Sequence, residues 1–133
     1  GGHPTGCAVA LETLRIYQSD DIAGRVAERG AQFRKSIQAF STHPMVGEVR
    51  ARGLMGAVEL VADKDSRTPF RQGARLGQFI TERAYHHGLI TRFTGNAMNL
   101  VPPLVIGERD LDEIFSRTSQ VIDDAWRVRQ DFL

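Results

Sequence analysis

The stretch HHGLITRFTGNAMNLVPPLVIGERDLDEI, from His86 to Ile114, contains signals for three elements in direct succession. Two short apolar runs, Leu89 to Phe93 and Ala97 to Val101, are joined through the turn residues TGN, which predicts two short strands. After a double proline, Gly107 stands at the expected N-cap of a helix. The apolar positions that follow recur at i, i+3, i+4 and i+7: Leu111, Ile114, Phe115, Thr118, Val121, Ile122 and Ala125. This repeat predicts a long amphipathic helix.

Arg92 is the unusual residue of this stretch, because a guanidinium is always charged and is costly to bury without a partner. By strand alternation it shares a face with Ile90 and Thr94. One interpretation is an edge-strand arginine in solvent or in an internal ion pair, and spacing alone favours it. The other is a receptor for a carboxylate or phosphate, which the planar guanidinium can bind through two parallel hydrogen bonds.

The chain before this stretch starts with two helical patterns. Residues 4 to 18 have a proline in the first turn and an Ala-rich run, which predicts a helix. Ser19 is the expected N-cap of a second helix that reaches Phe40.

The period then changes from that of a helix to that of a strand. Two β-branched and apolar runs, Val46 to Arg52 and Leu54 to Val61, are separated by Gly53, which predicts two strands in a hairpin or around a tight bend. A third helix is expected around Leu76 to Ala84, with Gly88 at its C-terminal end. The whole order indicates an α+β fold with a small, mostly antiparallel sheet of three to four strands covered by helices. At 133 residues the chain has the length of a single domain.

Bulk properties exclude several classes of function. The formal net charge of +1 gives no reason to expect a nucleic-acid or membrane partner, and no run of 18 apolar residues is present. A lone cysteine, Cys7, rules out an internal disulfide and is typical of a cytoplasmic protein; we expect it to be buried and inert. His86 and His87 are adjacent and point to different sides of a helix, so no metal site is predicted. The absence of an initiating Met indicates a piece of a longer protein.

Glu59 is the one carboxylate that a strand pattern places among apolar neighbours. A structural ion pair with Arg50 or Arg52 from the preceding strand is the favoured interpretation, and a catalytic role is the alternative.

Four segments in order, GHPTGCAVALETL, VGEVRARGLMGAVELVADKDSRTPF, GLITRFTGNAMNLVPPLVI and RDLDEI, resemble the C-terminal part of class III aminotransferases, the pyridoxal-phosphate enzymes that include the omega-amino acid:pyruvate transaminases. The resemblance covers nearly the whole chain. It implies transfer of an amino group from an amine or omega-amino acid to a keto acid such as pyruvate, with pyridoxal 5'-phosphate as cofactor. It also implies a small C-terminal α+β domain, here residues 42–133 after linking helices over 1–41, like that of fold type I enzymes, and a large cofactor-binding domain outside this chain.

The resemblance assigns roles to three residues. Arg92 matches the mobile arginine that binds the substrate carboxylate and swings aside for an uncharged amine. Gly2 and His3 match positions beside the cofactor phosphate of a neighbouring subunit, which implies a homodimer. The Schiff-base lysine of the family lies upstream, and neither Lys35 nor Lys64 matches it, so no catalytic residue is assigned and the isolated chain is expected to be inactive.

Two alternatives from other classes stay open. The chain could be a free-standing α+β module that binds small carboxylates, or regulates, through Arg92. It could also be a purely structural oligomerisation domain that uses the apolar face of its first helix.

Overall fold

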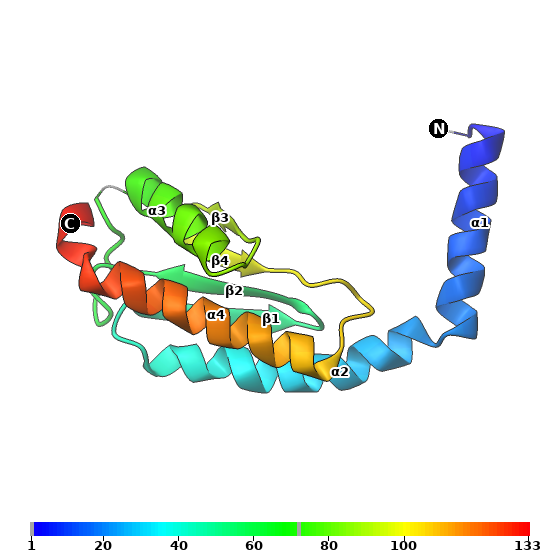
Figure 1. The fold of residues 1–133 in the computed structure, drawn as a ribbon, viewed down its shortest axis with the longest axis horizontal. Coiled ribbons are helices and arrows are strands. Elements are labelled where there is room, and N and C mark those ends of the chain that lie inside the picture. The colour runs from blue at the N-terminus through cyan, green and yellow to red at the C-terminus, as the bar shows by residue number, and fades with distance from the viewer. Residues whose placement is uncertain (1, 72) are drawn as a thin grey trace.

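The computed structural model describes residues 2–71 and 73–133 and contains the eight helices and strands in the predicted order (Figure 1). They are α1 (Pro4–Ser19), α2 (Ile22–Gln38), β1 (Val46–Arg52), β2 (Met55–Leu60), α3 (Gly73–His86), β3 (Arg92–Thr94), β4 (Ala97–Leu100) and α4 (Glu108–Arg127). Short 3₁₀ turns follow α2 at Ala39–Thr42 and α4 at Arg129–Phe132. The predicted α+β class is therefore confirmed.

The four strands form one antiparallel sheet in the order β1-β2-β4-β3. Gly53 and Gly95, at the turns of the two hairpins, both adopt a positive φ, which glycine tolerates without steric cost. β3 is shorter than predicted, since it starts at Arg92 and not at Leu89. The reason lies in α3, because the Leu89 N–H donates to the Ala84 carbonyl and the residue closes the helix end around Gly88.

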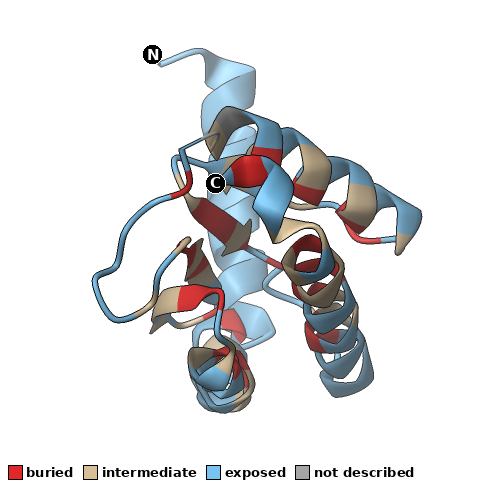
Figure 2. Cartoon of the chain, turned by 90° about the vertical axis from the view of Figure 1, so that its left-hand side faces the viewer, coloured by how far each residue is buried: buried red, intermediate tan, exposed pale blue. Residues whose placement is uncertain are grey.

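The hydrophobic core lies between the sheet and the three helices that cover one of its faces (Figure 2). Phe33 and Ile37 of α2 are fully buried against β2. Gly56 permits this close approach, because a Cβ at that position would lie 2.5 Å from Ile37 Cδ1 and 2.6 Å from Phe33 Cε1. The predicted apolar face of α4 also packs into this core, through Leu111, Phe115, Val121, Ile122 and Ala125.

The boundary between α1 and α2 differs from the prediction. Ser19 is the last residue of α1, where its hydroxyl donates to the Ile16 carbonyl at 3.2 Å. The N-cap of α2 is instead Asp21, whose φ is +45° and whose side chain accepts from the Gly24 N–H at 3.3 Å. Asp residues tolerate this left-handed conformation better than most, so the chain turns at Asp21.

α1 stands apart from the rest of the chain (Figure 1), and none of its residues, all of which the structure describes, is buried. Leu11 and Leu14 are 60% and 58% exposed. The prediction of a buried Cys7 is wrong, because the Ala-rich run that contains it packs on nothing within the described chain and the thiol is exposed. Within the described residues, no helix combines the length and apolar content needed to cross a membrane.

Candidate functional site

The candidate site lies on the face of the sheet opposite to the helices. Four residues on the four strands stand in register across this face: Arg50 pairs with Ala57, Ala57 with Asn99, and Asn99 with Arg92. Their neighbours along the strands, such as Val58 and Met98, point into the core, so by alternation these four side chains face the other way. The row has an arginine at each edge of the sheet, with Ala57 and Asn99 between them.

Arg50 forms two ion pairs on this face. Its guanidinium lies 2.7 Å from a Glu59 carboxylate oxygen and 3.2 Å from one of Glu48. The hydrogen bond to Glu59 is the main cause that raises the pKa of Arg50 above its ordinary value. This contact confirms the structural ion pair predicted for Glu59 and selects Arg50 as its partner.

Arg92, in contrast, is exposed, and its guanidinium makes no hydrogen bond or ion pair with any residue that the structure describes. It borders a hollow of about 470 Å³ lined by Ile90, Thr91, Arg92, Asn99 and Val101. Ile90 and Val101 are large apolar side chains, 93% and 66% exposed. The hollow thus places a free cation beside uncovered apolar surface, an arrangement suited to a small organic acid.

The backbone that carries Arg92 is held by two side chains that the sequence analysis did not identify. Asn99 donates from Nδ2 to the Arg92 carbonyl at 3.0 Å, and Thr91 donates from Oγ1 to the Asn99 carbonyl at 2.6 Å. Hairpin register is the signal that could have found them, because a turn centred on Gly95 and Asn96 puts residue 99 directly opposite residue 92.

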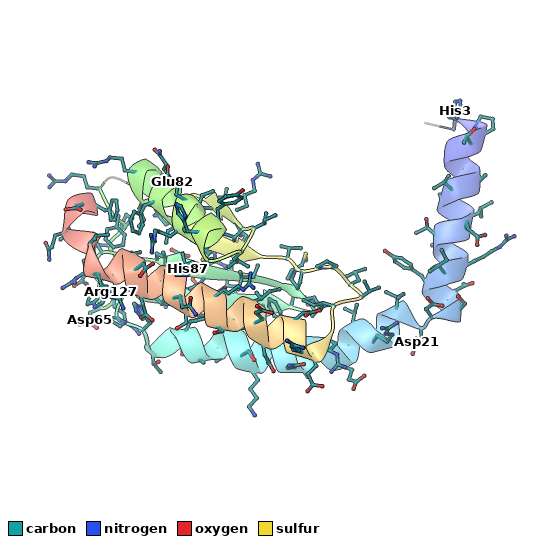
Figure 3. The ribbon with its side chains drawn as sticks, viewed as in Figure 1. His3, Asp21, Asp65, Glu82, His87 and Arg127 are labelled. Carbon is teal, nitrogen blue, oxygen red and sulfur yellow. The ribbon has the colours of Figure 1, made fainter. Side chains whose placement is uncertain are left out.

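Gly2 and His3 do not join this site. They lie at the N-terminal end of α1, which points away from the sheet (Figure 3). His3 occupies the N-cap position, and its side chain makes no capping hydrogen bond. Both residues are exposed.

Lys35, Lys64 and His87 lie outside the hollow beside Arg92. Lys64 donates from Nζ to the Ser41 and His43 carbonyls at 2.5 and 3.1 Å, and Lys35 is exposed on α2. Neither lines the hollow beside Arg92. His87 lies between α3 and α4 (Figure 3), with Nε2 2.9 Å from Asp124. Among the described residues, no cluster of three or more His, Cys, Asp or Glu side chains is arranged to hold a metal ion.

Comparison with known proteins gives consistent matches. The family profile described as Aminotransferase class-III matches residues 1–122. The chain is 37% identical over 123 residues to putrescine–pyruvate aminotransferase of Pseudomonas aeruginosa, covering 92% of this chain and 27% of the relative. Gamma aminobutyrate transaminase 3 of Solanum lycopersicum is 32% identical over 123 residues, which cover 92% of this chain and 24% of the relative.

A solved structure gives the same result. The omega transaminase of Pseudomonas jessenii in complex with PMP superposes with a TM-score of 0.88 at 39% identity, covering 94% of this chain and 28% of that one. The chain therefore spans about a quarter of the length of the proteins that it resembles.

Proposed function

This chain belongs to the class III aminotransferase family, and we propose that it forms the small C-terminal domain of a complete enzyme, to which it contributes the arginine that binds the substrate carboxylate. The complete enzyme transfers an amino group from an amine or omega-amino acid to a keto acid such as pyruvate. In this proposal residues 42–133 are the small domain and residues 1–41 link it to a large domain of the same polypeptide.

The state of Arg92 is the observation that carries the proposal. Its guanidinium is without a partner in the described chain, it projects from a strand, and it borders a hollow with apolar walls. Two parallel N–H···O bonds from a guanidinium fix a carboxylate in position and plane. An uncharged amine offers no such partner, so Arg92 acts on the acid substrates and leaves plain amines unaffected.

The cofactor of the family is pyridoxal 5'-phosphate, which acts as an electron sink when bound. Residues of this chain do not fit its covalent attachment, because Lys64 is held by two carbonyls and Lys35 lies on an exposed helix face. We therefore assign the attachment to a lysine of the large domain and regard the isolated chain as inactive. A lysine-dependent absorbance change on mixing the chain with pyridoxal phosphate would contradict this.

Gly2 and His3 complete the proposal on the cofactor side. The first turn of a helix presents free N–H groups that attract anions, and these two residues precede α1. We assign them to the surroundings of the cofactor phosphate in a neighbouring subunit of a homodimer. A cytoplasmic location agrees with a chain that has a single cysteine.

The test is Arg92→Ala in the complete enzyme, with Arg52→Ala as the matched control. Arg52 is an exposed arginine of β1, on the opposite edge of the same sheet. Hydrogen bonds between charged groups contribute about 1.5–3 kcal/mol, so loss of a bidentate pair worth about 2–3 kcal/mol raises the KM for pyruvate about 30- to 150-fold.

The KM for a monoamine without a carboxylate is expected to change less than about twofold in Arg92→Ala, because the pair is absent with that substrate. Arg52→Ala should leave both constants unchanged. Equal losses for the acid and the amine would refute the role of Arg92.

A further inference from the structure

Arg92 lies on β3, and few backbone hydrogen bonds hold this short strand in the sheet. β3 has three residues and lies at the edge of the sheet, where β4 is its one partner among the described strands. Gly88 and Gly95, both with a positive φ, flank the segment on its two sides. A guanidinium can select a carboxylate only if the backbone that carries it is held in place. The side chains that hold the backbone of β3 should therefore affect how well Arg92 binds the substrate carboxylate.

Two such ties run between β4 and the start of β3, and they are reciprocal. The Thr91 hydroxyl, from the residue just before β3, donates to the Asn99 carbonyl at 2.6 Å. The Asn99 side chain donates from Nδ2 to the Arg92 carbonyl at 3.0 Å, with longer contacts of 3.4 Å to Thr94 Oγ1 and the Ala97 carbonyl. We call this pair of bonds the Thr91–Asn99 clasp.

We propose that Thr91 and Asn99 are positioning residues for Arg92, which hold its backbone so that the guanidinium is presented to the substrate carboxylate. The inference rests on the proposed role of Arg92. It extends that role to Thr91, just before β3, and to Asn99 in β4. Both side chains act through main-chain atoms of the hairpin, and both residues are among those that line the hollow beside Arg92.

The position of Asn99 makes the inference sensitive to charge. Asn99 stands directly opposite Arg92 on the same face, and Cβ atoms of such cross-strand pairs lie about 4.5–5.5 Å apart. A carboxylate at position 99 would lose the Nδ2 donor and would also pair with the guanidinium. Asn99→Asp therefore both breaks the clasp and competes with the substrate, whereas Asn99→Ala only breaks the clasp.

The experiment uses the complete enzyme and four variants, with the KM and kcat for pyruvate and for a monoamine without a carboxylate. Thr91→Val keeps the branched shape and removes the hydroxyl, and we expect its KM for pyruvate to rise about 3- to 10-fold, as for the loss of one hydrogen bond. Asn99→Ala should raise the KM for pyruvate by a similar factor, and Asn99→Asp should raise it more than either of these variants. Thr91→Ser retains the donor and should stay within about twofold of the wild type. kcat and the amine KM should not change.

Arg92→Ala, measured in parallel, separates the two ideas. If it raises the pyruvate KM while Thr91→Val and Asn99→Ala do not, the positioning role is refuted and the role of Arg92 stands. If Arg92→Ala has no effect, both are refuted. Equal losses for acid and amine in the clasp variants would indicate a merely structural role and would also overturn the inference; unfolding midpoints identify a variant that fails to fold, and the remaining variants then decide.

Discussion

Asp124 of α4 offers the sharpest prediction on stability, because it joins two helices that cover the sheet. Its side chain is 15% exposed and receives hydrogen bonds from three residues. Arg83 of α3 approaches one carboxylate oxygen with Nε and Nη2 at 2.9 and 2.6 Å, and His87 approaches the same oxygen at 2.9 Å. Arg127 binds the other oxygen at 2.9 Å. Asp124→Ala removes all of these contacts in one step.

The expected loss follows from the exposure of the partners. A hydrogen bond to a charged group contributes about 1.5–3 kcal/mol, but exposed pairs contribute little, and Arg127 is 74% exposed. Arg83 and His87, which are 38% and 23% exposed, carry most of the effect. We expect the free energy of unfolding to fall by about 2–3 kcal/mol at neutral pH, which for a chain of this size lowers the Tm by about 6–12 °C.

The effect has a defined pH dependence. Hydrogen bonds from His87 and Arg83 hold the pKa of Asp124 below its ordinary value in the folded state. A lowered folded pKa means that the stabilisation is complete above the unfolded pKa of about 3.9 and is lost as the pH falls through the folded pKa. The difference between wild type and Asp124→Ala should thus be constant from neutral pH to about pH 5 and shrink below about pH 4.

Asp123→Ala is the matched control, since Asp123 lies on the same helix, is 50% exposed and, among the described residues, forms an ion pair only with His43, at 3.4 Å. Thermal unfolding followed by circular dichroism between pH 3 and pH 7 gives the comparison. Equal losses for the two variants, or a difference that persists undiminished at pH 3, would refute the reasoning on Asp124.

Two further predictions concern packing. Gly56→Ala should destabilise the chain by about 1–3 kcal/mol in urea unfolding, because the added Cβ would overlap Phe33 and Ile37; an unchanged midpoint would mean that α2 can move away from the sheet. Removal of residues 2–19 should change the free energy of unfolding by less than about 0.5 kcal/mol, since α1 contributes no buried residue; a larger loss would show that α1 packs on the domain.

The sequence was sufficient for the order of elements because the two hairpins and α4 carry strong local signals. Gly53 and the TGN turn separate runs of strand period, and the apolar repeat of α4 has few alternatives. The predicted start of β3 was wrong because the Leu89 N–H donates a hydrogen bond to the C-terminal turn of α3 and the residue therefore does not join the strand. Local propensity contains no information on which of two neighbouring elements a residue joins.

The site was accessible from the sequence only in part. Strand alternation put Arg92 on one face with Ile90 and Thr94, but its lack of a partner among the described residues depends on where every acidic residue lies. Glu59 had two candidate partners, and only the register of β1 with β2 selects Arg50. The burial expected for Cys7 failed for a similar reason, since an Ala-rich helix does not specify the surface on which it packs.

The isolation of α1 has a consequence for how the chain behaves by itself. A helix of 16 residues that buries none of its side chains is marginal in water, because its nucleation is unfavourable and packing of an apolar side normally compensates for it. In the 133-residue chain this segment should open at almost no free-energy cost, exchange its amide hydrogens quickly and be the first place where a protease cuts. Burial of Leu11 and Leu14, which are exposed here, against another surface would supply the stabilisation that α1 lacks.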